Sequence, residues 1–278
     1  MSDPITHVVI PDTQIEPGDP TDMCRWIGNY LVDHFAGRKN VKVIHLGDHA
    51  AMNSLSVHNS PLEQQGMTYE DDITSSNAAW AELNEPLVAY NKKRRQFKEK
   101  KWNPERHILL GNHENHISRA VQQDPRLEGK LKLSDLDYER SGWQVHPFLN
   151  VLSLDGVNYS HFFVNNSNGR AISGMIETRI KSIGASFVQG HQQGLKVGMV
   201  ETIAGRRRGI VAGSCYLKSE GYRGPQAMGE WRGILVLHQV RDGDYDLMEV
   251  SLDFLCRRYE GMPVADFVTK KYGLEWAG

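Results

Sequence analysis

Five short clusters of polar residues carry the side chains in this sequence that could bind metal ions or transfer protons. They are Asp12-Thr13-Gln14, Gly47-Asp48-His49, Gly111-Asn112-His113-Glu114, Ser160-His161 and Gly190-His191-Gln192-Gln193. Carboxylate and amide oxygens combined with imidazole nitrogens suit Mn, Fe or Zn better than a calcium site, which takes oxygen ligands. The sequence therefore predicts a metal site, provided that the fold brings the clusters together.

The predicted strands offer a way to bring them together. Apolar runs at His7–Ile10, Val41–Leu46 and His107–Leu110 predict buried strands, and each ends within one residue of a cluster. The helical spacing of Asp22–Phe35 between the first two strands predicts a parallel strand–helix–strand unit. Because the carboxyl ends of neighbouring parallel strands meet in one crevice, we expect the clusters to converge there.

The rest of the chain continues a mixed α/β pattern. A second helix is expected from Tyr69 to about Phe97, broken or kinked at Pro86, and a third over Glu114–Gln123. Beyond Asp124 short strands dominate, with one helix near Ala171–Ile183. These strands are expected at Trp143–Val145, Val151–Leu154, Val157–Phe163, Ser186–Gln189, Leu195–Ile203, Gly209–Ala212, Gly233–Val240 and Tyr245–Leu252.

Two sheets packed face to face, with helices outside them, would accommodate both parts of the chain. No linker rich in Ser, Pro or Gly divides the sequence. We therefore expect one domain over residues 1–252, with a helical insertion at about 53–106. Residues 253–278 are expected to form a tail that packs on the same domain across a sheet edge.

The five clusters, in this order, resemble the calcineurin-like metallophosphoesterase superfamily, whose pattern is D-x-H, G-D, G-N-H-[DE], a lone H and G-H-x-H. This sequence has DTQ, GDHA, GNHE, SH and GHQQ, and the resemblance extends over residues 5–252. The start PDTQ and the order GNHE, SGW, GHQ are similar to bacteriophage-encoded members described as repair-exonuclease-like. The resemblance implies a four-layer α/β/β/α sandwich of two mixed sheets flanked by helices.

The resemblance also implies roles for the site residues. Two divalent metal ions would be bridged by Asp48, with Asp12, Gln14 and Gln193 holding the first ion and Asn112, His161 and His191 the second. His113 would face the scissile phosphate and stabilise its charge or protonate the leaving oxygen, while a metal-activated hydroxide attacks.

Two residues depart from the family pattern on the first metal. Gln14 and Gln193 stand where the pattern has histidine. An amide oxygen is a harder and weaker ligand than imidazole, which favours Mn, with Mg, Zn, Fe or Ni as alternatives, and a first site that binds weakly or stays empty. The alternative is that the two amides bond to each other or to water, leaving a one-metal or defective enzyme.

A third departure concerns the substrate. Related protein phosphatases have G-D-x-V-D-R-G, in which the arginine clamps a phosphomonoester, whereas Ala51 and Met52 fall in the corresponding stretch here. This favours a phosphodiester substrate, with a DNA nuclease of phage type as the first hypothesis. His49 and His116 lie close to site residues and could touch substrate or serve a structural role.

Two basic segments could contact nucleic acid. Residues 92–101 hold seven Lys and Arg with one Glu, and Arg206-Arg207-Arg208 is expected at a hairpin tip, with Arg206 as a candidate substrate contact. Phosphate binding beside the site is one interpretation. A solvated helix end whose cations complement the helix dipole is the other.

Composition limits the classes of function. A net charge of −2 with 40% hydrophobic residues excludes a disordered chain and a protein that coats nucleic acid by bulk charge. No apolar run is long enough for a membrane span, and three widely spaced cysteines predict reduced thiols rather than disulfides. No secretory signal is evident, so we expect the cytoplasm, or the host cytoplasm for a phage protein. The sequence does not indicate an oligomeric state.

Three hypotheses for the function follow. The first is a metal-dependent phosphodiesterase, and the second is a phosphomonoesterase acting on a nucleotide or phosphoprotein. The third is a catalytically weak scaffold that binds a partner, which the two glutamines would permit. His113 argues against the third, because a binding module has no evident need for that side chain next to Asn112.

Overall fold

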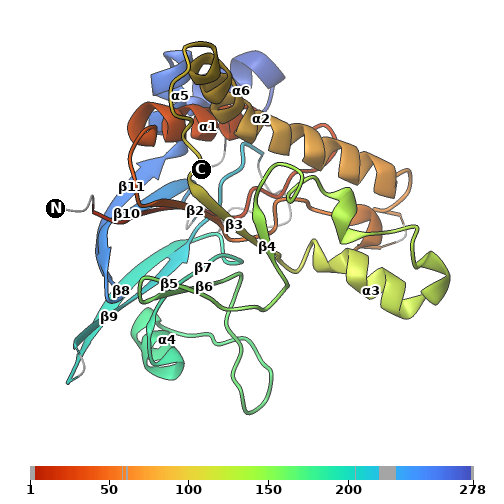
Figure 1. The fold of residues 1–278 in the computed structure, drawn as a ribbon. Coiled ribbons are helices and arrows are strands. Elements are labelled where there is room, and N and C mark those ends of the chain that lie inside the picture. The colour runs from red at the N-terminus through yellow and green to blue at the C-terminus, as the bar shows by residue number, and fades with distance from the viewer. Residues whose placement is uncertain (1–3, 58, 61, 204, 219–229, 277–278) are drawn as a thin grey trace.

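Two mixed β-sheets and six α-helices make up the described part of the chain, which comprises residues 4–57, 59–60, 62–203, 205–218 and 230–276 of a computed structural model (Figure 1). The first sheet has six strands in the order β11-β10-β1-β2-β3-β4. Strands β1 to β4 run parallel, while β10 and β11 are antiparallel additions at one edge. Its strands are β1 (Thr6–Ile10), β2 (Val41–His45), β3 (Glu105–Leu109), β4 (Gln144–His146), β10 (Gly233–Arg241) and β11 (Asp244–Ser251).

The second sheet has five strands in the order β5-β6-β7-β9-β8. Strands β6, β7 and β9 are parallel, and β5 and β8 close the two edges as antiparallel strands. The strands are β5 (Leu152–Leu154), β6 (Val157–Ser160), β7 (Ser186–Gln189), β8 (Leu195–Thr202) and β9 (Gly205–Ala212).

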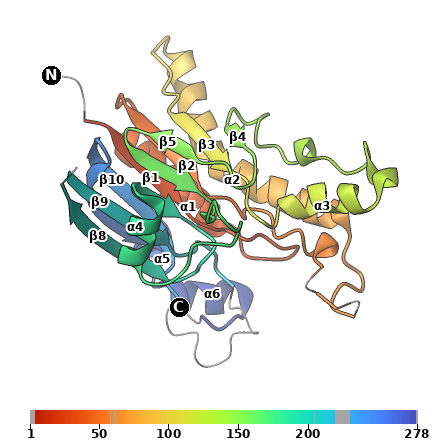
Figure 2. The same ribbon diagram turned by 90° about the horizontal axis from the view of Figure 1, so that it is seen from below.

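The helices lie outside the two sheets (Figures 1 and 2). Four of them gather over the six-stranded sheet, while α4 lies against the five-stranded sheet. The helices are α1 (Asp22–Phe35), α2 (Tyr69–Gln96), α3 (Asn115–Gln123), α4 (Ile176–Ile183), α5 (Leu252–Glu260) and α6 (Val264–Tyr272). Short 3-10 turns at Asn53–Leu55, Pro125–Leu127 and Leu133–Asp135 complete the elements.

Three clusters of buried apolar side chains hold these layers together. The largest joins one face of the six-stranded sheet to α1, α2, α5 and α6. A second cluster fills the space between the sheets, where Val9 and Ile44 of the first sheet meet Tyr159 and Val188 of the second. A third places Ile180 of α4 on the outer face of the second sheet. The expectation of two mixed sheets flanked by helices is therefore confirmed at this level.

Helix α2 is not broken at Pro86. The helix runs without interruption from Tyr69 to Gln96, with Pro86 inside it. The ring of Pro86 lies against α1 at Gly28, where a Cβ would come within 2.9 Å of the proline Cγ. Because Gly28 has no side chain, α1 and α2 pack closely at this point and support the helix where proline removes a hydrogen bond.

The last part of the chain is also more regular than expected. Residues after 252 form α5 and α6, which bury Leu255, Cys256 and Phe267 in the same cluster as Trp26 of α1. The Trp26 indole Nε1 donates a hydrogen bond of 2.8 Å to Glu260. These helices lie on α1, beside the edge formed by β11.

Two expectations drawn from composition agree with the structure. All three cysteines are buried and free. Among the described residues, no helix is long and apolar enough to cross a membrane.

Candidate metal centre

The five polar clusters converge at the carboxyl ends of the parallel strands. The first three follow β1, β2 and β3 of one sheet, and the other two follow β6 and β7 of the second. The two sheets are joined here, because the Cys215 amide after β9 donates to the Asp12 carbonyl after β1 at 2.7 Å, and His161 Nδ1 lies 2.9 Å from the Leu46 carbonyl. The convergence expected from strand topology is therefore present.

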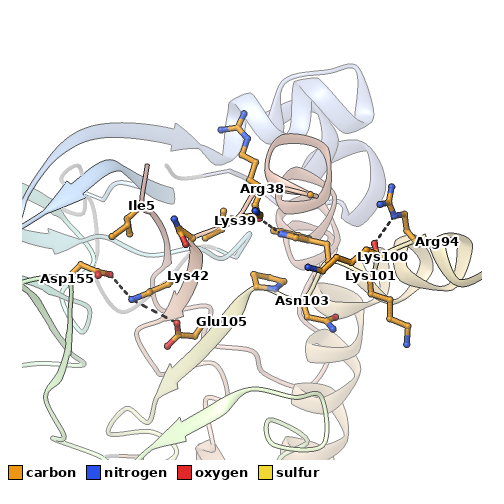
Figure 3. Close-up of a pocket in the computed structure, with 15 residues that line it drawn as sticks. Ile5, Arg38, Lys39, Lys42, Arg94, Lys100, Lys101, Asn103, Glu105 and Asp155 are labelled. Atoms are coloured by element: carbon orange, nitrogen blue, oxygen red, sulfur yellow. Dashed lines mark hydrogen bonds and ion pairs between the residues drawn. The ribbon is translucent and has the colours of Figure 1, made fainter. Parts of the chain in front are cut away.

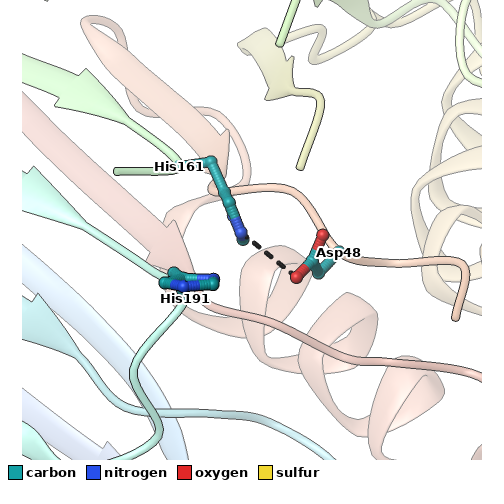
Figure 4. Close-up of side chains that lie close together, drawn as sticks. All are labelled: Asp48, His161 and His191. Carbon is teal, nitrogen blue, oxygen red and sulfur yellow. Dashed lines mark ion pairs between the residues drawn. The ribbon is translucent and has the colours of Figure 1, made fainter. Parts of the chain in front are cut away.

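Asp48, His161 and His191 form a group that could hold a metal ion (Figure 4). Each offers one ligand atom, and these atoms lie within 4.8 Å of one another. Asp48 Oδ2 is 3.1 Å from His161 Nε2, and both side chains are almost fully buried. The rings of His161 and His191 are 5.2 Å apart between centroids. Within the described residues, no other group of three or more His, Cys, Asp or Glu side chains has its ligand atoms this close together.

Asn112 adds an amide oxygen to this group. Its Oδ1 lies 2.9 Å from His161 Nε2, while His161 Nδ1 lies 2.9 Å from the Leu46 carbonyl. That carbonyl only accepts hydrogen bonds, so Nδ1 carries a proton and Nε2 is the atom that faces Asp48 and Asn112. Burial lowers the pKa of His161, but the Asp48 carboxylate raises it more, to about 10. Two oxygen acceptors and an imidazole nitrogen thus face one point, which is an arrangement that a cation satisfies.

Asp12 is buried beside this group and is held by the backbone. Its Oδ2 accepts a hydrogen bond of 2.9 Å from the His191 amide. Burial, together with the negative charge of Asp48, raises the pKa of Asp12 to about 7, although His161 opposes the shift. The pKa of Asp48 itself lies below its usual range, because the nearby His161 and His113 outweigh the effect of burial.

Gln14 and Gln193 contact each other. Gln193 Nε2 donates to Gln14 Oε1 at 3.2 Å, and Gln14 Nε2 lies 3.4 Å from His113 Nε2. The two amides thus form a short chain that ends at His113. All eight residues expected at the centre lie in one connected network, but the structure does not assign Asp12, Gln14 and Gln193 to a metal.

His113 lies at the opening of the network, with about a quarter of its side chain exposed. Its Nδ1 is 2.6 Å from the Ala51 carbonyl, which directs Nε2 toward Asp48 Oδ2 at 3.8 Å. Burial lowers the pKa of His113, but the Asp48 carboxylate and the hydrogen bond to the Ala51 carbonyl have a larger, opposite effect. The pKa of His113 therefore lies above its usual value. The ring is thus positioned by protein contacts and can hold a proton at Nε2.

Three of the ten described non-glycine residues with a positive φ lie in this network. Gln14, Asp48 and His191 all have positive φ angles, of 40°, 48° and 66°. Such conformations cost about 1–3 kcal/mol each and tend to persist at functional sites. The close approach also requires glycine next to them, since a Cβ at Gly111 would lie 2.0 Å from Asp48 Oδ1 and one at Gly190 would lie 2.4 Å from Asp12 Oδ1.

Glu114 has a role that the sequence analysis missed. Its buried carboxylate accepts hydrogen bonds from the backbone amides of Asp48, His49, Ala50 and Gly111, and from the Tyr138 hydroxyl. The side chain therefore fixes the loop after β2 against the loop after β3. The sequence signal was an acidic residue at the start of a helix next to a strand-ending glycine, where free amides are expected.

Two histidines proposed as substrate contacts do not face the opening. His49 is fully buried, with Nδ1 2.8 Å from Thr13 Oγ1 and Nε2 3.0 Å from the Ser76 carbonyl. His116 is only 3% exposed and lies against the Met52 carbonyl. Burial lowers the pKa of each to about 4. Of the two roles considered for His49 and His116, the structure supports the structural one and not contact with a substrate.

Both basic segments lie away from the centre, so of the two interpretations left open the one that places them beside the site is not supported. Arg206 is at the start of β9, six residues or about 20 Å along the strand from the end near the site. It pairs there with Glu201 and Asp244. Residues 92–101 form the last turns of α2 and the start of its connection to β3, so they lie near the amino ends of the parallel strands, opposite the centre.

No model of a protein family matches the sequence, and no curated protein matches it.

Proposed function

We propose that the protein is a metal-dependent phosphodiesterase with the layered fold of the calcineurin-like metallophosphoesterases. The observation that carries the proposal is the meeting of Asp48, His161 and His191 at one point, next to His113. The clusters stand in the order of that superfamily, and the two sheets place them at one edge. DNA is the first substrate that we propose within this class.

The donor set supports a divalent metal at this point. Asp48, Asn112, His161 and His191 would hold it, through one carboxylate, one amide oxygen and two imidazoles. This mixture of ligands suits Mn, Fe or Zn, and we propose Mn because Gln14 and Gln193 would supply only amide oxygens to a second ion. A divalent metal in such a site lowers the pKa of bound water from about 15.7 to near neutrality, which supplies a nucleophile.

The chain's own residues provide the remaining chemistry. His113 can donate a hydrogen bond or a proton from Nε2 to a phosphate or leaving oxygen, since Nδ1 is held by the Ala51 carbonyl. Its raised pKa keeps a larger fraction protonated near neutral pH. Asp48 orients the His113 backbone, because its Oδ1 accepts from the His113 amide at 2.9 Å.

The surroundings of the site favour a diester over a monoester. Among the described residues, no Arg or Lys side chain forms a hydrogen bond or ion pair with Asp48, His113 or His161. A monoester carries one more negative charge than a diester, and a bidentate arginine is the usual way to hold it. The contact between Gln14 and Gln193 favours the alternative of a catalytically weak scaffold, because amides that satisfy each other leave the first metal weakly held.

The test compares two model substrates after metal removal and addition of Mn²⁺. We expect faster hydrolysis of bis-(p-nitrophenyl) phosphate than of p-nitrophenyl phosphate. Preference for the monoester would replace the proposal with a phosphomonoesterase, and hydrolysis of neither would favour the scaffold.

A further inference from the structure

A pocket of about 600 Å³ lies at the edge of the first sheet opposite the metal centre (Figure 3). It is bounded by the connection between α1 and β2, the connection between α2 and β3, and the turn that carries Asp155. Its lining is rich in cations, which are Arg38, Lys39, Lys42, Arg94, Lys100 and Lys101. The chain has a net charge of only −2, so this concentration of positive charge is local.

Hydrogen bonds between the bounding segments give the pocket a fixed shape. The Trp102 indole Nε1 donates to the Arg38 carbonyl at 3.0 Å, which joins the two connections. Asn91 Oδ1 of α2 accepts a hydrogen bond of 2.9 Å from the Trp102 amide, and Arg94 Nε donates one of 3.0 Å to the Lys100 carbonyl. The backbone that presents the cations is thus held in place before any ligand binds.

Part of the positive charge is balanced within the protein and part is not. Lys42 pairs with Asp155 at 2.6 Å, and Arg94 pairs with Glu99 at 3.0 Å. The side chains of Arg38, Lys100 and Lys101 are exposed and make no hydrogen bond or ion pair with the described residues. These three cations are available to bind an anion.

The end of α2 next to the pocket carries further exposed cations and an exposed aromatic ring. Lys92, Lys93, Arg95 and Lys98 are exposed along the end of α2. Among them lies the ring of Phe97, which is 66% exposed. Cations that follow a phosphate backbone, with an aromatic ring on which a base stacks, are the pattern of proteins that bind single-stranded nucleic acid.

We propose that this surface, formed by Arg38, residues 92–98, Lys100 and Lys101, binds a single strand of nucleic acid. The cations would contact phosphates and Phe97 would stack on a base. The extent of the cationic surface favours a polymer over a small phosphate compound, which would fill the pocket alone. The surface borders the amino end of β2, whereas the metal centre lies beyond the carboxyl end of that strand. The inference therefore does not depend on the proposed hydrolysis.

The experiment measures binding of a fluorescently labelled 20-nucleotide oligothymidylate to the full-length protein by anisotropy, from 50 to 200 mM salt. A gel run afterwards establishes that the oligonucleotide is intact. We expect the slope of log affinity against log salt to become shallower by about 1.4 in Lys100→Gln/Lys101→Gln, since each lost contact to a single strand contributes about 0.7. Phe97→Ala should weaken binding at least about fivefold with little change in slope.

The control variant Lys181→Gln/Lys196→Gln removes the same charge from exposed positions on α4 and β8. It should leave both affinity and slope close to those of the unmodified protein. An unchanged slope in Lys100→Gln/Lys101→Gln, or an equal change in the control, would overturn the proposal. So would tighter binding of a duplex that does not respond to Phe97→Ala. An Asp48→Asn variant that loses hydrolysis and keeps oligothymidylate binding would separate this surface from the proposed catalytic site.

Discussion

The orientation of the His113 ring suits a group that contacts a substrate rather than one that binds a metal ion. The Ala51 carbonyl fixes one ring nitrogen, and the other points into the opening beside Asp48 and Gln14. The metal-ligating residues beside it would bind without this ring. The arrangement suits a group that meets a substrate rather than an ion.

Replacing His113 therefore separates catalysis from metal binding. We predict that His113→Ala lowers the rate of diester hydrolysis by at least about 10²-fold, the lower range for acid–base catalysis. The content of bound metal, measured by mass spectrometry after dialysis, should not change. Loss of metal in His113→Ala, but not in His238→Ala, would show that His113 is a ligand instead.

The contact between Gln14 and Gln193 leads to a second prediction. Imidazole is a softer ligand than an amide oxygen, so Gln14→His/Gln193→His should shift metal preference from Mn toward Zn. Competition between the two ions, followed by dialysis and metal analysis, measures the shift. Gln192→His is the matched control, because Gln192 accepts a hydrogen bond from Arg179 at 2.9 Å instead of contacting Gln14. Equal preference in the double variant and the unmodified protein would mean that these side chains do not face a metal.

At the scale of elements, the contact between α1 and α2 depends on one glycine. A Cβ at Gly28 would lie 2.4 Å from the Leu83 carbonyl oxygen. In an ordinary helix, glycine to alanine stabilises by about 1 kcal/mol. Here we predict that Gly28→Ala destabilises by about 1–3 kcal/mol, because the helices must move apart. Urea unfolding measures the change, and the adjacent Asn29→Ala should show no such loss; a stabilised Gly28→Ala would contradict the packing described.

The two sheets are also joined by a polar contact, which makes stability depend on pH. His7 of β1 bonds to the Tyr159 hydroxyl of β6 at 2.7 Å and to Asp155 at 2.9 Å. Burial lowers the pKa of His7 to about 4, although Asp155 opposes the shift. Between pH 6.5 and 4 the unfolded chain binds a proton at His7 that the folded chain does not. This contribution to stability is therefore complete above pH 6.5 and is lost as the pH falls.

We predict that the unmodified protein loses about 2 kcal/mol more stability than His7→Gln between pH 7 and pH 5. Urea unfolding of both proteins at the two pH values gives the difference. The other titrating groups are common to both proteins and cancel in the comparison. An equal loss in the two proteins would show that His7 takes up its proton in the folded state.

The elements differ in how far the sequence could predict them. The apolar runs of β1 and β2 and the periodic spacing of α1 identified these elements almost to the residue. Strand β9 was predicted to begin at Gly209, but it begins at Gly205, because Glu201 and Asp244 neutralise Arg206 and Asp244 neutralises Arg208 in the sheet. The close packing of α2 against α1 at Pro86 depends on Gly28, which no local pattern reveals.

At the scale of the whole molecule, the two ends of the first sheet differ in chemistry. The carboxyl ends of its parallel strands carry Asp12, Asp48 and Asn112, and the amino ends border the cationic pocket. The sequence identified the residues of the first end, because each follows a recognisable strand. It left two interpretations of the basic residues 92–101 open, because the course of α2, which carries them to the other end of the sheet, is not evident from a local pattern.

The site was likewise predictable only in part. Strand order brings Asp48, His161 and His191 together, and that order follows from the alternation of strands and helices. The direction of a side chain depends on its neighbours in three dimensions, so His49 and His116 could not be excluded beforehand. The part played by Glu114 depends on four amides from two separate loops, which are close only in the folded chain.

The most direct test of the proposed centre is a titration of Mn²⁺ into the metal-stripped protein, with hydrolysis of bis-(p-nitrophenyl) phosphate as the readout. Our account predicts a rate that rises with Mn²⁺ and saturates, because the ion completes a site whose ligands are already positioned. Asp48→Asn should abolish the rise, while the same change at the exposed Asp246 should not. A rate that does not respond to Mn²⁺, or that responds equally in Asp48→Asn, would contradict the assignment of this cluster as a catalytic metal centre.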